Sequence, residues 1–360
     1  MNALSAIVAG FLVTVIAIFA LRPVALSLAL VDRPGGRKTH HGEVPLVGGM
    51  AMFFGIVVGI GFLAPPLLIV GPLLAVFSLI VVIGTLDDRF TLSHWTRLFV
   101  QFGASAALVM GTNTVVRNMG DPFGIGTILL PEVGAVIFSV ALVAAAINAF
   151  NMLDGIDGLA GIIALVTLTG LGLYERQAGV DGTDAAICAV VGAAICGFLI
   201  FNIPGRFNRS VRCFMGDSGS TLIGVAVAWL AIRMSQLPVH GGVHPVTVMW
   251  IVALPLYEIF WTVVRRLLRG RSPFAPDTEH FHHLLRDARL SVRAVFFVFL
   301  LLDALLVAAG FLLAALHVPD WVSLLLLVST GVALVRSMYV AQWIVCKFPA
   351  MARGEPAVDL

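Results

Sequence analysis

The sequence predicts an all-α integral membrane protein with about eleven transmembrane helices, ten being possible because several breaks are short. Two observations predict this class. The 360-residue chain has a mean hydropathy of +1.02 and 59% hydrophobic residues, well outside the composition of soluble domains. Apolar runs long enough to cross a bilayer also recur about every 25–35 residues. The bilayer is therefore the expected solvent for most of the chain.

The expected spans follow one another with short polar breaks. They lie at residues 3–21, 46–64, 67–85, 98–115, 130–149, 159–175, 184–202, 218–236, 246–264, 294–316 and 321–337. No basic stretch precedes the first run and no convincing small-residue cleavage site follows it, so we expect a retained span rather than a signal peptide. One membrane domain covers residues 1–347, and residues 348–360 form a short polar tail.

Lysine and arginine gather in alternate loops. Sixteen of the twenty-two basic residues lie in segments 22–45, 86–97, 148–158, 203–217 and 265–293. By the positive-inside rule these segments face the cytoplasm, which places the N-terminus outside and, with eleven spans, the C-terminus inside. The net charge of +2 does not indicate nucleic acid as a partner, because basic residues at a membrane face meet anionic lipid or a phosphorylated substrate. The four cysteines have no metal-ligand spacing and are expected to be structural.

Four polar clusters interrupt the apolar chain, all on the predicted cytoplasmic side. They lie at residues 84–89, 148–158, 214–220 and 280–283, and the first three hold five of the twenty carboxylates. Carboxylates, amides and glycines at the mouths of apolar helices indicate a metal and a phosphorylated ligand.

Asp87 and Asp88 directly follow the third expected span. Adjacent carboxylates repel each other unless a cation or a donor neutralises them. The pair has three interpretations that the sequence leaves open. The acids are solvated and cap the next helix, or they pair with Arg89 or Arg97, or they belong to a site.

The segment 148–158 gives a more specific signal. Asn148, Asn151, Asp154 and Asp157 keep a three-residue step, so they share one face if the segment is helical. The glycines among them let a backbone or a ligand approach closely. Two Asn and two Asp without a basic residue do not form a solvated face, and polar side chains of this kind mark a site in a bilayer protein.

Asp217 and Ser218 stand where a helix is expected to begin, flanked by glycines. Either residue is a good N-cap for the following span, and a helix N-terminus also attracts phosphate oxygens. Hard oxygens from Asp and Asn, completed by phosphate oxygens and water, suit Mg²⁺ rather than zinc.

Two basic loops complete the pattern. His280, His282 and His283 share a loop with five arginines, which favours an anion clamp. A zinc site with Asp277 or Glu279 and a plain surface loop stay as alternatives, although the spacing matches no familiar zinc pattern. The loop at residues 32–41, which contains Lys38 and His41, either sets the topology or forms a wall that faces phosphate.

Together these motifs resemble the polyprenyl-phosphate N-acetylhexosamine-1-phosphate transferase family. The matching stretches are residues 31–49, 84–89, 148–161, 201–224 and 272–285. The most diagnostic are Asn-Met-Leu-Asp-Gly-Ile-Asp-Gly-Leu-Ala-Gly and Phe-Met-Gly-Asp-Ser-Gly-Ser. The His-Phe-His-His loop with its preceding Ser-Pro-Phe-Ala-Pro-Asp, and the longer insert between Asn202 and Asp217, resemble the WecA branch rather than the MraY branch.

The resemblance implies ten or eleven transmembrane helices with an active site at the cytoplasmic face of a bacterial cytoplasmic (inner) membrane. It implies transfer of N-acetylhexosamine-1-phosphate, foremost GlcNAc-1-phosphate, from a UDP-N-acetylhexosamine to undecaprenyl phosphate, with UMP as the second product. Such a step opens surface glycan synthesis, for example of O-antigen lipopolysaccharide. Mg²⁺ or Mn²⁺ is the implied cofactor, membrane lipid surrounds the enzyme, and a homodimer is left open.

The resemblance also implies roles for single residues. Asp217 matches the family's metal-binding Asp, and Asn151 matches a position that shares the metal. Asp157 and Phe214 match positions that bind and stack the uracil. Glu258 stands where the family often has Asp, and we assign it no role. In full, we expect catalytic roles for Asp87, Asp88, Asp154, Asp217 and His280, and substrate-binding roles for Lys38, His41, Asn148, Asp157, Asn202, Phe214, His282 and His283.

The expected chemistry is one direct displacement, with the lipid phosphate attacking the β-phosphorus of the UDP-sugar and Asp87 or Asp88 orienting it. A two-step route through an aspartyl-phosphate stays open. The alternatives keep this chemistry with a deoxy-N-acetylhexosamine or with UDP-MurNAc-pentapeptide. A secondary transporter is a remote alternative, because the acids gather at one face and no inverted repeat is visible.

Overall fold

The computed structural model describes residues 3–33, 42–180, 182–204, 211–239, 242–274 and 279–347. Within these ranges the chain forms thirteen helices. In chain order they are α1 (Ala3–Ser27), α2 (Gly48–Leu63), α3 (Leu67–Phe90), α4 (His94–Thr112), α5 (Glu132–Leu153), α6 (Leu159–Ala178), α7 (Thr183–Asn202), α8 (Gly216–Ser235), α9 (Pro245–Ile251), α10 (Ala253–Leu268), α11 (Phe281–Asp287), α12 (Val292–Ala315) and α13 (Asp320–Lys347).

Two short antiparallel strand pairs join helices at the ends of the bundle. The first pair is β1 (Val31–Asp32) with β2 (Val44–Pro45), and the second is β3 (Pro238–Val239) with β4 (Gly242–Val243). In the first pair Val31 lies opposite Pro45, and this pairing leads the chain from α1 back into α2.

The prediction of an all-α, multi-pass membrane protein is confirmed. Among the described residues, eight helices are long and apolar enough to cross a bilayer, and the bent pair α9–α10 makes a ninth. Helices α2 and α4, with 16 and 19 residues, coincide with the other two expected spans. Each of the eleven expected spans thus lies on a helix or on the bent pair, while their orientation across the membrane stays a prediction.

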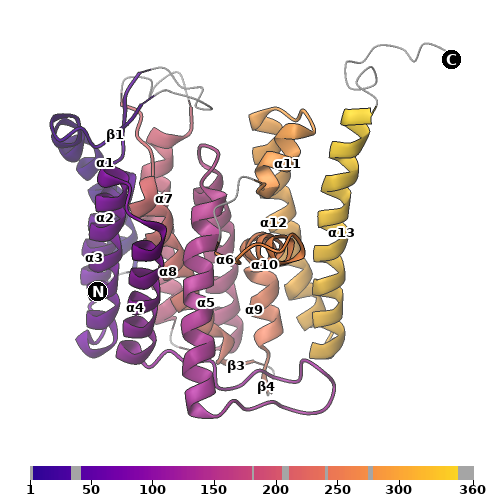
Figure 1. Ribbon diagram of the computed structural model, residues 1–360. Coiled ribbons are helices and arrows are strands. Elements are labelled where there is room, and N and C mark those ends of the chain that lie inside the picture. The colour runs from indigo at the N-terminus through magenta and orange to yellow at the C-terminus, as the bar shows by residue number, and fades with distance from the viewer. Residues whose placement is uncertain are drawn as a thin grey trace.

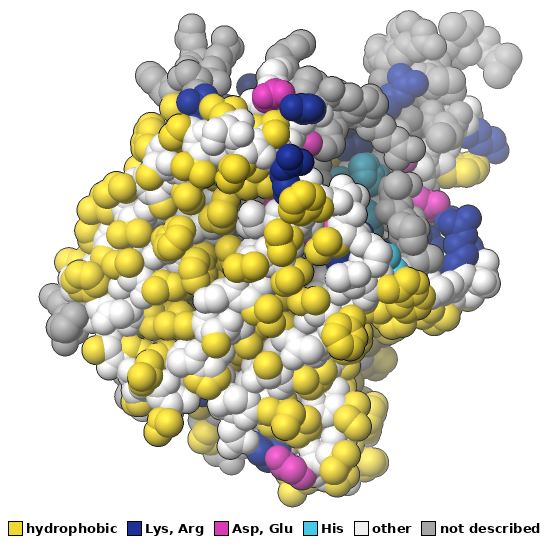
Figure 2. All heavy atoms as spheres, turned by 60° about the vertical axis from the view of Figure 1, so that its left-hand side comes forward, with side chains coloured by type: hydrophobic (Ala, Val, Ile, Leu, Met, Phe, Trp, Pro, Cys, Tyr) yellow, Lys and Arg dark blue, Asp and Glu magenta, His cyan; other side chains and the backbone are white. Residues whose placement is uncertain are grey.

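Most of the long helices stand side by side in Figure 1. Helix α8 lies at the centre of the bundle, because 89% of its most apolar 18-residue stretch is buried. The corresponding share is 22% in α1 and in α13. On the face shown in Figure 2, hydrophobic side chains cover the flank, and most charged side chains gather at its upper end. This distribution is typical of a protein whose flank contacts lipid.

The expected span at residues 246–264 is not one straight helix. It is divided into α9 and α10, which meet at an angle of 84° around Val252. Pro255, which has no backbone N–H to donate, lies in the first turn of α10, where that donor is not needed. The bend turns α10 across the bundle, so that in Figure 1 it is seen nearly end-on.

Helices α3 and α8 pack unusually closely where the polar residues begin. A Cβ added at Gly84 would lie 2.4 Å from the Cα atom of Ser218 and 2.6 Å from its backbone nitrogen. Only a glycine lets the two backbones come so near. This contact places the last two turns of α3 against the first turn of α8.

Candidate active site

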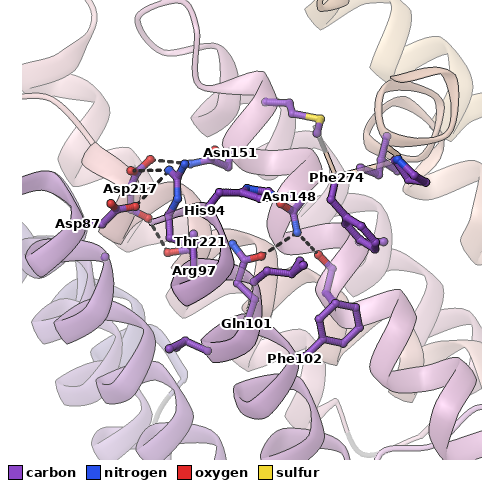
Figure 3. A pocket seen from close by; sticks show the side chains of 18 of the residues that line it. Asp87, His94, Arg97, Gln101, Phe102, Asn148, Asn151, Asp217, Thr221 and Phe274 are labelled. Atoms are coloured by element: carbon purple, nitrogen blue, oxygen red, sulfur yellow. Dashed lines mark hydrogen bonds and ion pairs between the residues drawn. The ribbon is translucent and has the colours of Figure 1, made fainter. Parts of the chain in front are cut away.

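A cavity of about 470 Å³ opens between α3, α4, α5, α8 and α10. Figure 3 shows a polar group of side chains at one side of it and aromatic and apolar side chains at the other. The polar lining consists of Asp87, His94, Arg97, Gln101, Asn148, Asn151, Asp217, Thr221, Arg266 and His280. All four polar clusters of the sequence therefore contribute to the wall of one cavity.

The acidic pair lies inside α3 rather than in the loop after it, because the helix continues to Phe90. Asp87 is buried and turns toward α4. Its Oδ1 accepts a hydrogen bond from the backbone N–H of Leu92 at 2.7 Å, and its Oδ2 accepts one from Nη1 of Arg97 at 3.2 Å. The interpretation of an ion pair with Arg97 is confirmed, and the one with solvated loop acids is wrong for Asp87.

Asp88 turns instead toward α8. Its Oδ1 accepts from the backbone N–H of Asp217 at 2.8 Å and its Oδ2 from that of Ser218 at 3.4 Å. The expectation that Asp217 or Ser218 caps α8 is wrong, because the helix already begins at Gly216. The acceptor for the first N–H groups of α8 comes from α3, where a carboxylate also complements the helix dipole.

Asp217 faces the cavity from the first turn of α8. Its Oδ1 accepts from Nδ2 of Asn151 at 2.7 Å, and its Oδ2 lies 3.7 Å from Nη1 of Arg97. Arg97 therefore bridges Asp87 and Asp217, as Figure 3 shows. From the sequence, Arg97 was expected only as a partner for the acidic pair. Its position in the first turn of the helix that follows two acids was the sequence signal that could have identified it as a site residue.

The amide and acid series at residues 148–158 shares one helical face only in part. Asn148 and Asn151 lie in the last turns of α5, which ends at Leu153, whereas Asp154 and Asp157 belong to the turn that follows. Asn148 lines the cavity, where its Nδ2 donates to Oε1 of Gln101 at 2.9 Å. Asn148 and Asn151 therefore line the cavity, whereas Asp154 and Asp157 are not among its lining residues.

Asp154 lies close enough to the other acids for their charges to act on it. Burial is the main cause that raises the pKa of Asp154 well above its usual range, and the charges of Asp217, Asp88 and Asp157 raise it further. Carboxylates crowded in this way favour a bound cation, because a positive charge relieves their mutual repulsion.

Asp157 and Phe214 are brought together through Arg212, outside the residues that line the cavity. Arg212 forms an ion pair with Asp157, and its guanidinium carbon lies 5.0 Å from the ring centroid of Phe214. Arg212 was not expected from the sequence. The cation over an aromatic ring and the carboxylate beside it form a single group that offers both stacking and hydrogen-bonding surface.

Asn202 is buried at the end of α7 and engages the backbone with both ends of its amide. Its Oδ1 accepts from the N–H of Gly158 at 2.6 Å, and its Nδ2 donates to the carbonyl of Cys213 at 3.1 Å. These contacts give it a structural role, since they tie the turn after α5 to the segment before α8. Its substrate-binding role stays a prediction.

The three histidines differ in their surroundings. His280 lines the cavity, and its Nδ1 lies 2.9 Å from Oε1 of Glu258. His282 is buried against Gly155, and burial followed by the neighbouring histidines lowers the pKa of His282 to about 3. The ring centroids of His282 and His283 lie 4.1 Å apart. His282 is therefore a neutral ring at physiological pH, and a charge-based anion clamp would have to rely on its two neighbours.

Arginines in the last turn of α10 and directly after it hold the histidine loop. Arg269 pairs with Glu279 at 2.6 Å, and Arg265 lies 3.8 Å from the same carboxylate. Arg266, which also lines the cavity, donates to the carbonyl of Pro273 at 2.5 Å. Glu279, named as a conceivable zinc ligand, is thus a partner of arginines.

The zinc alternative finds no support in the part of the chain that the structure describes. No group of three or more His, Cys, Asp or Glu side chains in those ranges is placed to hold a metal ion by itself. Asp277, the other conceivable zinc ligand, and the predicted substrate-binding residues Lys38 and His41 lie outside the described residues.

An apolar bundle with carboxylates, amides and an arginine gathered in one cavity is typical of a membrane protein that has a binding or catalytic site. Residues 70–235 match the model of glycosyl transferase family 4. The chain is 37% identical over 339 residues to the undecaprenyl-phosphate alpha-N-acetylglucosaminyl 1-phosphate transferase of Yersinia pestis, covering 93% of this chain and 92% of the relative. For the proteins of the same name from Salmonella typhi and Escherichia coli K12 the identity is also 37%, over 96% and 93% of this chain and 94% and 91% of the relatives.

The chain therefore belongs to glycosyl transferase family 4. The family membership inferred from the motifs is confirmed, and with it the class of enzyme, a sugar-1-phosphate transferase.

Proposed function

We propose that the protein transfers GlcNAc-1-phosphate from UDP-GlcNAc to undecaprenyl phosphate, giving undecaprenyl-diphosphate-GlcNAc and UMP. One observation carries the proposal: a carboxylate, an amide and an arginine, namely Asp217, Asn151 and Arg97, meet in a cavity that many apolar side chains also line. Such a cavity offers contacts for a phosphate and for a hydrocarbon chain at once. The names of the relatives support the choice of sugar and lipid.

Asp217 and Asn151 would hold Mg²⁺ or Mn²⁺. The donor set fits, because Mg²⁺ takes hard oxygen ligands and is usually bound through one or two carboxylates, with water and substrate phosphates completing the shell. The charges of Asp217, Asp88 and Asp157, which add to the effect of burial in raising the pKa of Asp154, also favour a cation here. When bound, the ion neutralises pyrophosphate charge and makes UMP a better leaving group.

The remaining polar residues position the reactants. Arg97 offers a fixed positive charge beside Asp87 and Asp217, and the pair of Asn148 and Gln101 continues the polar wall along the cavity. The second proton of a phosphate monoester has a pKa near about 6, so the attacking phosphate is already an anion near neutral pH. A strong general base is scarcely needed, and direct attack on the β-phosphorus accounts for the site with the fewest steps.

The group of Asp157, Arg212 and Phe214 is the proposed uracil site. Asp157→Ala and Phe214→Ala should raise the KM for UDP-GlcNAc by about tenfold, with a smaller effect on kcat, because contacts to the base are equal in the ground and transition states. Initial rates at varied UDP-GlcNAc measure both constants. Glu132→Ala is the matched control, since it breaks an exposed arginine–carboxylate pair with Arg117 at the other end of α5. An unchanged KM with a collapsed kcat would contradict the assignment.

We propose a bacterial cytoplasmic membrane location with the cavity open to the cytoplasm. In a background without the native cysteines, Ser272→Cys should resist an impermeant maleimide added to intact cells, and Phe123→Cys should react. Both side chains are exposed, so access alone decides the result. Permeabilised cells provide the control, because both cysteines should then be labelled. Labelling of Ser272→Cys from outside would separate the cavity from cytoplasmic UDP-sugars.

The sugar is tested by measuring UMP release from several UDP-sugars with undecaprenyl phosphate and Mg²⁺. We expect UDP-GlcNAc to be the best substrate, with a kcat/KM at least about tenfold above a deoxy-N-acetylhexosamine donor and above UDP-MurNAc-pentapeptide. A higher kcat/KM for either of the other donors would support the proposed reaction and contradict the choice of UDP-GlcNAc as its substrate.

A further inference from the structure

Glu258, for which the sequence suggested no role, is an isolated acid in an apolar helix. It lies on α10, the arm of the bent pair that crosses the bundle, and its side chain is only 1% exposed. A carboxylate withdrawn from water to this degree needs compensating donors. An ionisable residue buried in the apolar part of a membrane protein is therefore a candidate for a function.

Both oxygens of Glu258 are engaged by one short segment of the chain. Oε1 lies 2.9 Å from Nδ1 of His280, and Oε2 accepts from the backbone N–H of Phe281 at 3.1 Å. Because the N–H of Phe281 can only donate, Oε2 must accept, and the carboxylate has a second acceptor left for the ring. As a carboxylate, Glu258 has no proton to donate, so the ring donates from Nδ1.

This contact leaves one ring nitrogen of His280 for a ligand. His280 lines the cavity, and its Nε2 has no partner among the residues that the structure describes. With the proton held at Nδ1, a neutral ring presents Nε2 as an acceptor, and a protonated ring presents it as a donor. His282 cannot take over this part, because it is buried and neutral.

The histidine loop is held in place by other contacts as well. Glu279 pairs with Arg265 and Arg269 one residue before His280, and Arg266 holds the carbonyl of Pro273. Loss of the Glu258 charge alone should thus alter the ring of His280 more than the position of the loop.

We propose that Glu258 is a positioning residue for His280, which fixes the Nδ1–H tautomer and aims Nε2 into the cavity. The part that concerns catalysis rests on the proposed function. Glutamine is the informative replacement, because its amide has a single acceptor oxygen, whereas the ring of His280 and the N–H of Phe281 each need one. In Glu258→Gln the new amide must either leave the N–H of Phe281 unpaired or present an NH₂ group to Nδ1 of His280, which reverses the tautomer.

The tautomer is read directly by NMR of ¹⁵N-histidine-labelled protein in detergent, with the His280 signals assigned by their loss in His280→Gln. We expect a protonated Nδ1 and an unprotonated Nε2 in the neutral ring of the wild type, a shift toward the reverse in Glu258→Gln, and retention of the wild-type pattern in Glu258→Asp. Glu279→Gln is the matched control, since it weakens the loop anchor and should leave the tautomer unchanged. A wild-type ring protonated at Nε2 overturns the proposal, whatever the protein's activity.

A double-mutant cycle tests the catalytic part. Glu258→Gln should lower kcat by about 10- to 100-fold, as loss of an outer partner of a functional histidine typically does, and change the KM for UDP-GlcNAc by less than about threefold. Added to His280→Gln, it should cost less than about threefold more, because its effect passes through that ring. If the two losses multiply, Glu258 does not act through His280, and the positioning role in catalysis is wrong. A wild type that shows the expected tautomer but releases no UMP would defeat the proposed function and leave the positioning intact.

Discussion

Replacing Asp217 by asparagine should lower transfer activity by about 100-fold or more while the protein still folds, because the change removes charge from the site with little change in shape. The amide that replaces the carboxylate keeps a carbonyl oxygen, so the hydrogen bond from Asn151 survives. What is lost is the negative charge that would help to hold the metal and that lies 3.7 Å from Arg97. UMP release at several Mg²⁺ concentrations measures the effect.

Asp320→Asn provides the matched control for this change. Asp320 also lies in the first turn of a helix, and it pairs with His244 at 3.0 Å, away from the cavity. Both substitutions remove a stabilising charge at a helix N-terminus, which is worth about 0.3–1 kcal/mol. Activity should fall only in Asp217→Asn. Near wild-type transfer by that variant at low Mg²⁺ would rule out the metal role of Asp217.

Replacing Gly84 by alanine should damage both stability and activity, because the new methyl group would meet the backbone of Ser218 at 2.4–2.6 Å. Overpacking of this kind costs about 1–3 kcal/mol. The displacement also acts on the site, since Asp87 and Asp88 lie one turn beyond Gly84 and face residues of α4 and α8. A misplacement of about 1 Å at a catalytic centre can cost about 100-fold in rate, and we expect a loss of that order.

Gly71→Ala is the control for Gly84→Ala, since it places the same substitution in the same helix. A Cβ at Gly71 would meet only the side chain of Leu67 at 3.8 Å, which is an ordinary contact. This variant should keep wild-type activity and thermal stability. Thermal unfolding in detergent and UMP release compare the two, and equal behaviour would contradict the close approach of α3 and α8.

Hydropathy located the helices because a bilayer requires every backbone group to be paired within its own segment. Each expected span therefore coincides with a helix or with the bent pair. The 84° bend at Val252 was not predicted, although Pro255 marks the start of a new helix. Proline tells where a helix can begin, but the direction of the next helix depends on its packing partners. The extension of α3 to Phe90 was also missed, because charged residues at its end are typical of a loop.

The sequence predicted which residues belong to the candidate site better than it predicted the contacts between them. Asp217 and Asn151 were expected to share a ligand, and the structure places their side chains 2.7 Å apart. Asp88 caps α8, and Arg97 bridges Asp87 and Asp217. These contacts join segments that are far apart in the chain, so no local sequence pattern predicts them. Glu258 did carry a signal, since a single acid inside an apolar helix needs a partner.

In the proposed reaction, the phosphate next to the sugar moves with it to the lipid. The purified protein, UDP-GlcNAc labelled in its β-phosphate, undecaprenyl phosphate and Mg²⁺ test this in one reaction. We expect the label to pass into the lipid fraction in a one-to-one ratio with the UMP released. Recovery of the label as water-soluble UDP, with the sugar alone on the lipid, would show ordinary glycosyl transfer and rule out transfer of the sugar phosphate.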